Sequence, residues 1–145
     1  MTAASENIRE QISGVLRRKD TLVVFVDALP EHSILMSRLS ASHIPFIELH
    51  DEQGRYAFGP LLLEALEGPK VIWEKRRRQI LIIGDVRNVG VTHLCLGALG
   101  EGMETFFYPT GDTSDFQTEI SIRRLTRSGA FPIPLVHVVE ELSMV

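Results

Sequence analysis

Residues 80–102 constrain the fold of this chain more than any other segment. The apolar residues 80–83 are typical of a β-strand, Gly84 ends that strand, and residues 92–102 have a helical pattern after a short polar turn. In an open α/β sheet, a strand, a tight turn and a helix in this order place a ligand at the carboxyl end of the strand, beside the helix N-terminus. The segment therefore predicts an α/β fold whose functional site lies at this turn. Gly90 stands where a nucleophilic side chain would be expected, so the turn leaves open whether the chain is an enzyme.

Strand and helix patterns alternate along the remaining sequence. Residues 21–26 are continuously apolar, which predicts a strand covered on both faces. Further strand patterns occupy residues 45–49, 71–73, 105–108 and 131–136, and helical patterns occupy residues 33–42, 61–66, 114–127 and 137–142. Residues 1–20 have apolar positions at helical spacing and predict an amphipathic N-terminal helix. We therefore expect residues 1–145 to form one domain, a three-layer α/β/α fold of Rossmann type with a mostly parallel sheet.

Local signals add detail to this expectation. Only six residues separate Trp73 from Ile80, whereas a parallel crossover needs about a dozen or more. Residues 71–83 are therefore expected to form an antiparallel hairpin, unless residues 71–73 lie outside the main sheet. Asn88 is a predicted N-cap for the helix that begins near Gly90, and Ser114 with Gln117 has the spacing of a capping box.

Composition excludes several classes of function. The net charge of −4 does not favour nucleic-acid binding, and the apolar runs are too short for the roughly 20 residues of a membrane span. Residues 1–10 lack the apolar core of a signal peptide, and a single cysteine suits a reducing compartment, so we expect a cytoplasmic protein. The five histidines lack metal-ligand spacing, and residues 84–90 match neither GxGxxG nor a Walker motif. We therefore expect no metal and no cofactor.

The second half of the chain carries a family pattern. Residues 81–84 form an apolar strand that ends in glycine, residues 88–91 read Asn-Val-Gly-Val, Ala98-Leu99 and Gly102 follow in a helix, and residues 105–108 form the next strand. This order and spacing resemble the carboxyl-terminal half of the isochorismatase-like cysteine hydrolases, which include nicotinamidases and carbamoylases. Residues 123–125, 128–130 and 139–142 are also similar to the end of that family's sequences.

The first half resembles the same family less closely. Residues 23–27 are similar to its first strand, so the resemblance implies that Asp27 is the equivalent of the general base. Residues 71–76 are similar to the strand that carries the catalytic lysine, which implies that role for Lys75. The chain is shorter than a typical member, lacks the helix that follows the lysine, and has Gly90 at the position of the nucleophilic cysteine.

Cys95 is no obvious substitute for that nucleophile. It shares a helix face with Val91, Leu94 and Ala98, which predicts a buried structural cysteine. Lys75 belongs to a basic run over residues 75–78 that fits either a solvated loop or an anion site. The second interpretation would bring phosphate or carboxylate to that run.

These observations leave two classes of function open. In the first, the chain is a non-hydrolytic binding or assembly protein that holds a small anionic or amide ligand at Asn88, Val89 and Gly90. In the second, it is a cysteine-independent hydrolase in which Asp27 activates water and Lys75 or backbone N–H groups stabilise an oxyanion. In either case we expect Asp27 and Gly90 to lie at adjoining strand ends.

Two further expectations concern assembly and a rival family. The resemblance implies a homo-oligomer, and the aromatic residues 106–108 with Phe131 fit either a subunit interface or ordinary core packing. Residues 22–33 also resemble the beginning of a glutaredoxin, although the redox cysteines are absent. That fold has no place for the strands and helices after Gly102.

Overall fold

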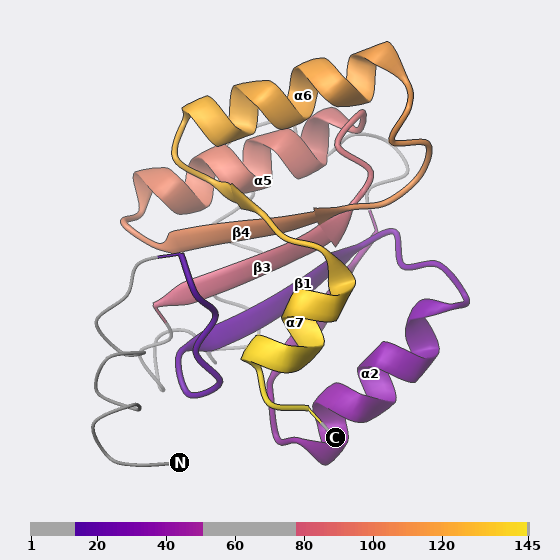
Figure 1. Cartoon of the computed structure of the whole chain (residues 1–145), viewed down its shortest axis with the longest axis vertical. Helices are drawn as coiled ribbons and strands as arrows, with labels where there is room; N and C mark the ends of the chain where they lie inside the picture. Colours follow the sequence, from indigo (N-terminus) through magenta and orange to yellow (C-terminus); the bar gives the residue numbers. More distant parts are fainter. Residues whose placement is uncertain (1–13, 51–77, 145) are drawn as a thin grey trace.

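A five-stranded parallel sheet organises the molecule (Figure 1). The computed structural model describes residues 14–50 and 78–144. The strands are β1 (Thr21–Val26), β2 (Phe46–Leu49), β3 (Gln79–Gly84), β4 (Glu104–Pro109) and β5 (Phe131–Pro132), in the spatial order β2-β1-β3-β4-β5. Every neighbouring pair is parallel. The predicted three-layer α/β/α fold with a mostly parallel sheet is confirmed.

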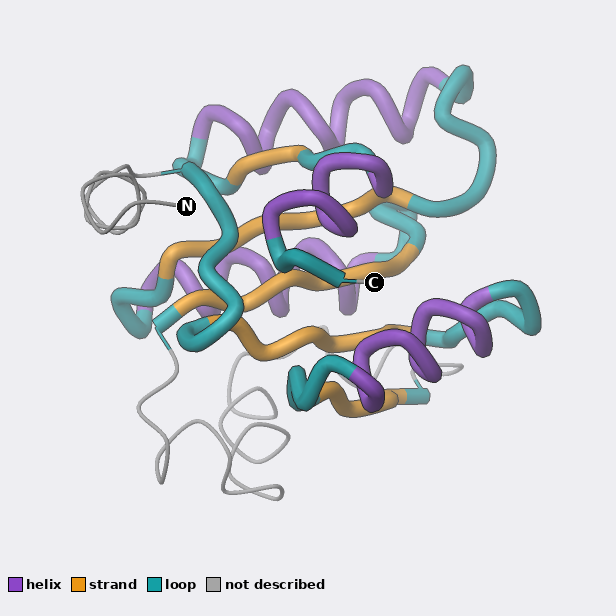
Figure 2. Tube along the Cα trace, turned by 60° about the horizontal axis from the view of Figure 1, so that its bottom comes forward, coloured by secondary structure: helices purple, strands orange, loops and turns teal. Residues whose placement is uncertain are grey.

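In the described part of the chain, four helices cover the two faces of this sheet, two on each (Figures 1 and 2). They are α2 (His32–Ala41), α5 (Val89–Gly100), α6 (Phe116–Arg127) and α7 (Leu135–Glu141). Helices α5 and α6 cover one face, and α2 and α7 cover the other. None of the helices in the described part of the chain is long and apolar enough to cross a membrane.

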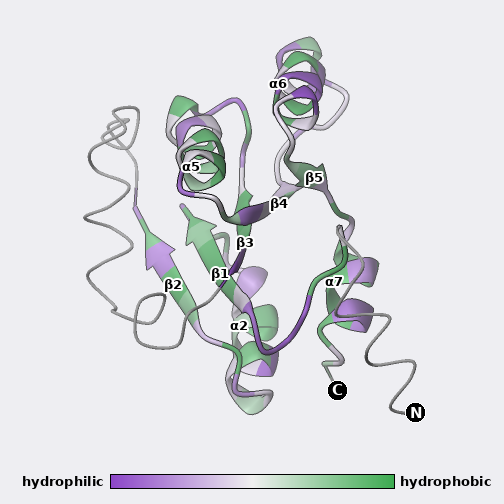
Figure 3. Cartoon of the chain, turned by 90° about the vertical axis from the view of Figure 1, so that its left-hand side faces the viewer, coloured by the Kyte–Doolittle hydropathy of each residue, from purple (hydrophilic) through white to green (hydrophobic). Residues whose placement is uncertain are grey.

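The two central strands explain why the sheet has a core on each face. All residues of β1 and of β3 are buried, which fits their continuous apolar sequences. Because side chains alternate along a strand, Val24 and Ile82 contribute to the core beneath α5 and α6, whereas Phe25 and Ile83 contribute to the core beneath α2 and α7. Figure 3 shows the hydrophobic β1 in green, with α5 on one side of the sheet and α2 on the other.

Gly84 determines how closely α5 approaches the sheet. A Cβ atom at this position would lie 2.8 Å from Cγ2 of Val91 and 3.3 Å from Cβ of Val26. Any side chain at residue 84 would therefore push α5 away from the ends of β1 and β3. The glycine that ends the predicted strand is thus required by close packing of strand against helix.

Residues 14–20 contradict one sequence prediction, because they form turns and irregular chain instead of the end of a helix. Leu16 is buried in the core beneath α2 and α7. The backbone N–H groups here are hydrogen-bonded to side chains distant in sequence. The Leu16 N–H donates to Glu141 Oε1 at 2.9 Å, and the Arg17 N–H donates to Gln79 Oε1 at 2.6 Å. These tertiary hydrogen bonds override the local helical pattern. Residues 1–13 lie outside the described part.

Smaller differences appear near the carboxyl end. The last strand covers only Phe131–Pro132, and α7 begins at Leu135, before the predicted helix. Prolines at positions 132 and 134 lack the N–H needed for further strand pairing. Helix α6 is capped by Asp115, whose carboxylate accepts from the Gln117 N–H at 2.7 Å, and not by Ser114.

The structure also decides between the alternative interpretations. Phe106 and Phe107 are fully buried, and Phe106 packs against Phe131 with ring centroids 5.3 Å apart, so the aromatic cluster belongs to the core. Of the two interpretations, core packing therefore accounts for Phe106, Phe107 and Phe131. The glutaredoxin-like alternative is wrong, because β4 and β5 complete the same sheet after Gly102. The segments predicted at 61–66 and 71–73, and with them the hairpin, lie outside the described residues.

Candidate functional site

A hollow of about 320 Å³ opens at the carboxyl ends of β1, β3 and β4. We call it the crevice; its lining consists of Val26, Asp27, Leu29, Asp85, Asn88, Thr110 and Gly111. Asp27 follows β1 directly, and Asn88 precedes α5, the helix that follows β3. Since β1 and β3 are neighbours, the structure brings Asp27 and the start of α5 together, as predicted.

Asp27 adopts an unusual backbone conformation at the end of β1. Its φ of 52° lies in the left-handed region, which aspartate tolerates better than most residues with a side chain. Its N–H donates to the carbonyl of Leu49 at 2.8 Å, so the chain is held by β2 as it turns away from the sheet. Its carboxylate faces Asn88, with Oδ2 3.5 Å from Nδ2. Strained backbone of this kind is found preferentially at functional sites.

Asn88 is the N-cap of α5, which confirms the sequence prediction. Its side-chain Oδ1 accepts from the Gly90 N–H at 2.8 Å, and its backbone carbonyl accepts from the Val91 N–H at 3.0 Å. The cap fixes the orientation of the side-chain amide, with Oδ1 toward the helix and Nδ2 toward Asp27. The Gly90 N–H, a natural anion donor at a helix N-terminus, is therefore already engaged within the protein.

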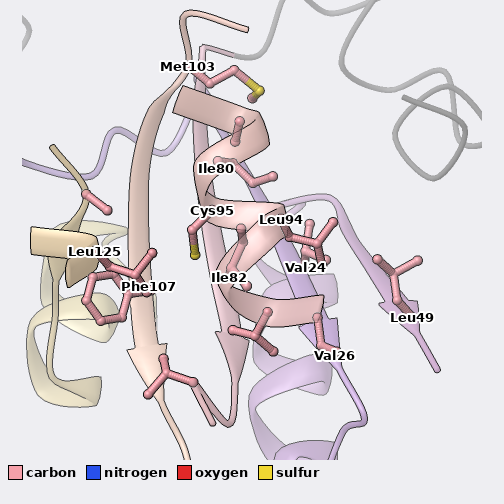
Figure 4. Close-up of a cluster of buried hydrophobic side chains, with 14 of the residues drawn as sticks. Val24, Val26, Leu49, Ile80, Ile82, Leu94, Cys95, Met103, Phe107 and Leu125 are labelled. Atoms are coloured by element: carbon pink, nitrogen blue, oxygen red, sulfur yellow. The ribbon is translucent and has the colours of Figure 1, made fainter. Parts of the chain in front are cut away.

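The other residues at the start of α5 have no reactive group. Gly90 is buried and has no side chain, and Val89 is 54% exposed. Cys95 lies one to two turns further on, fully buried among Ile82, Leu94 and Phe107 in the core (Figure 4). Burial raises the pKa of its thiol to about 12. The prediction of a buried structural cysteine is confirmed.

An ion-pair cluster beside the crevice was not predicted from the sequence. Arg87 donates hydrogen bonds to the Asp85 carboxylate from its backbone N–H at 2.9 Å, its Nε at 3.0 Å and its Nη2 at 2.6 Å. The hydrogen bonds from Arg87 hold the pKa of Asp85 below its ordinary value. Arg87 Nη1 also lies 3.5 Å from Oδ2 of Asp115, the cap of α6. The guanidinium thus ties the β3–α5 turn to the beginning of α6.

Gly111 completes this side of the crevice. It has a φ of +83°, and a Cβ atom there would lie 2.8 Å from Asp85 Oδ2 and 3.3 Å from Arg87 Nη2. A larger residue would disrupt the ion pair. The sequence contained one indication that Asp85 lies at the crevice, because Asp85 directly follows β3 just as Asp27 directly follows β1. The parallel arrangement then places both carboxylates at the same edge of the sheet.

Only part of the basic run over residues 75–78 lies in the described part of the chain. Lys75 lies outside the described residues. Arg78, from the same basic run, precedes β3 and donates its N–H to the Asp20 carbonyl at 3.0 Å, so it lies at the sheet edge opposite Asp27. Within residues 14–50 and 78–144, no group of three or more His, Cys, Asp and Glu side chains is arranged to hold a metal ion.

Comparison with known proteins identifies the architecture. No family model matches the chain, and no curated protein is similar to it in sequence. Among solved structures, the YcaC gene product of Escherichia coli, an octameric hydrolase of unknown specificity, matches with a TM-score of 0.68 and 16% identity over 92% of this chain and 84% of YcaC. This chain has the fold of YcaC. YcaC from Pseudomonas aeruginosa, in a structure with hexane-2,5-diol and covalent acrylamide, matches with a TM-score of 0.67 and 19% identity over 91% of this chain and 84% of its own. At these identities, the likeness to YcaC establishes the fold alone.

Proposed function

We propose that this chain is a divergent isochorismatase-like protein that binds a small amide-bearing molecule in the crevice and does not hydrolyse it. The main support for the proposal is that Gly90 offers neither a reactive side chain nor an available N–H. At the position that the family resemblance assigns to the nucleophile, the chain has no side chain, and its N–H is bonded to Asn88 at 2.8 Å. The shared fold with the hydrolase YcaC supports a descent from enzymes.

Acyl transfer on this fold would need two groups that the crevice does not supply from these residues. The first is an attacking atom, and the nearest thiol in the chain is the buried Cys95. The second is a pair of donors for the oxyanion, whereas the N–H groups of Gly90 and Val91 are both bonded to Asn88. Binding without turnover follows from these two deficits.

The charges around the crevice favour an amide over an anion. Asp27 and Asp85 both line it, and Arg87 already neutralises Asp85. The seven lining residues include two carboxylates and no basic side chain, so the lining favours a ligand that donates hydrogen bonds over an anion. A carboxamide instead presents two N–H donors that Asp27 can accept, and the Thr110 hydroxyl can donate to its carbonyl oxygen.

A calorimetric titration with nicotinamide as the probe tests the binding proposal. We expect saturable binding to the unaltered protein and its loss in Asp27→Asn, which keeps the shape and the tolerance for positive φ but removes the negative charge. Asp112→Asn is the matched control, because it removes the same charge outside the crevice lining. Equal affinity in both variants, or no binding to the unaltered protein, would contradict the proposal.

One observation favours a second candidate, the cysteine-independent hydrolase. Asp27 lines an open hollow large enough for both a small substrate and a water molecule. A carboxylate in this position is a suitable general base for an attacking water. This candidate predicts steady hydrolysis of nicotinamide or an N-carbamoyl amino acid by the unaltered protein, abolished in Asp27→Asn. Our proposal predicts no turnover in either protein.

A further inference from the structure

A second hollow lies on the face of the sheet that α2 and α7 cover (Figure 2). Its volume of about 450 Å³ falls within the roughly 300–1,000 Å³ that is typical of small-molecule sites, and it shares no lining residue with the crevice. Ile83 of β3 and Tyr108 of β4 line it from the sheet, whereas Leu35 of α2 and Leu135 of α7 line it from the two helices. We call it the α2–α7 groove.

Apolar side chains make up most of the groove lining. Ile34 and Val139 complete the apolar set that Leu35, Ile83 and Leu135 begin. Two of these side chains remain in contact with solvent, since Ile34 is 71% exposed and Leu135 is 41% exposed. Covering such surface with an apolar group is favourable because it removes the surface from water. The groove therefore suits a ligand with an apolar body.

His32 supplies a hydrogen-bond donor at a defined ring atom of this lining. Its Nδ1 accepts from the Leu29 N–H at 3.1 Å, and its ring packs against Phe25 with ring centroids 5.6 Å apart. Burial lowers the pKa of His32, so the imidazole is mainly neutral at neutral pH. A neutral imidazole whose Nδ1 accepts a hydrogen bond carries its proton on Nε2. The group that His32 offers to a ligand is therefore the Nε2–H donor.

Tyr108 adds a second polar group to the same lining. Within residues 14–50 and 78–144, neither the Tyr108 hydroxyl nor Nε2 of His32 has a hydrogen-bond partner. The charged lining residues are one acid, Glu31, and one base, Arg38, so the lining carries no net charge and favours a neutral ligand. No ligand contact is assigned to Arg38, which already has an interaction within the protein.

We propose that the α2–α7 groove binds a small neutral carbonyl compound, a ketone or an ester with an apolar body. The carbonyl oxygen accepts from His32 Nε2–H, the Tyr108 hydroxyl is the second donor for the polar end of the ligand, and the apolar body covers Ile83 and Leu135. A carbonyl group matches these donors because it accepts hydrogen bonds and has none to donate. The groove is separate from the crevice, so this site is independent of what the crevice binds.

An NMR titration of ¹⁵N-labelled protein with acetophenone tests this site. The matched probe is α-methylstyrene, which has a methylene group in place of the carbonyl oxygen and keeps the planar shape. We expect saturable shifts of the Ile83 and Leu135 amides with acetophenone. We expect weaker binding of α-methylstyrene, although it is the more apolar of the two, because it cannot accept from His32 or Tyr108.

Three variants separate the hydrogen bonds from the shape of the groove. His32→Phe keeps an aromatic ring beside Phe25 and removes the Nε2 donor, whereas Tyr108→Phe removes only the hydroxyl. Each should raise the dissociation constant for acetophenone by about two- to tenfold, the worth of one neutral hydrogen bond, and leave that for α-methylstyrene within about twofold. His137→Phe is the matched control, because His137 is exposed on α7 outside the groove lining, and it should change neither constant.

The same titrations distinguish the other occupants of the groove. Acetophenone that fails to saturate, or that shifts only the crevice amides of Asn88 and Gly111, would overturn the proposal. Equal affinity for the two probes, or equal losses for both probes in His32→Phe and Tyr108→Phe, would show a merely apolar surface and overturn it as well. Shifts of the groove amides on raising the protein concentration without a probe would instead assign the groove to a second copy.

Discussion

The cysteine of this chain is expected to resist alkylation in the folded protein. Burial raises the pKa of Cys95 from its ordinary value of 9.0 to about 12. A thiol with that pKa has roughly a thousandth of the usual thiolate at neutral pH, and the thiolate is the species that attacks. The Sγ atom is also fully enclosed by the core beneath α5, so a reagent reaches it only when the structure opens. We therefore expect alkylation at least about a thousandfold slower than at an exposed thiol.

Intact-mass spectrometry with acrylamide measures this difference. Gly100→Cys supplies the exposed reference, because a side chain at residue 100 would meet no heavy atom within 4 Å. We expect one rapid adduct on this variant, none on the unaltered protein over the same time, and one on the unaltered protein in denaturant. Alkylation of native Cys95 within about tenfold of the reference rate would refute the argument that the chain has no usable thiol nucleophile.

Two further predictions concern stability and are measured by chemical denaturation. Gln79→Leu should lower the free energy of unfolding by about 2–5 kcal/mol, because the buried Gln79 side chain accepts from the Arg17 N–H at 2.6 Å and donates to the Val15 carbonyl at 2.7 Å. Thr118→Val should change the free energy of unfolding by less than about 1 kcal/mol or increase it, because the equally buried Thr118 hydroxyl has no hydrogen-bond partner in the described structure. Equal losses of stability in Gln79→Leu and Thr118→Val would contradict this reasoning. Burial lowers the pKa of His32 below its ordinary 6.5, so the unfolded chain takes up a proton first and stability should fall as the pH drops below 6.5. His32→Gln should flatten that slope, and an unchanged slope would show that His32 is not its source.

The parts of the fold that follow from local sequence were predictable. Continuous apolar residues in β1 and β3 indicated strands buried on both faces, and the parallel arrangement then placed Asp27 near the start of α5. Asn88 was identifiable as an N-cap because its side chain and the helix it caps are adjacent in sequence. The buried Cys95 followed from the helical spacing of its apolar neighbours.

The parts that depend on distant contacts were not predictable in the same way. Residues 14–17 lose their helical pattern because Gln79 and Glu141 bind their backbone, and no local signal records such pairing. The Asp112 carboxylate binds the N–H and the hydroxyl of Ser114, which leaves Asp115 to cap α6. The ion pair of Arg87 with Asp115 likewise joins two turns that only the folded sheet brings together.

The most direct test of the proposed function is one NMR experiment on ¹⁵N-labelled protein with excess nicotinamide, followed over many hours. It reads binding from the protein amides and hydrolysis from the signals of the small molecule in the same tube. We predict saturable shifts of the amides that line the crevice, at Asn88, Thr110 and Gly111, while the nicotinamide signals stay constant. Growth of nicotinate signals with the unaltered protein, absent with Asp27→Asn, would contradict the account and establish a hydrolase that works without cysteine.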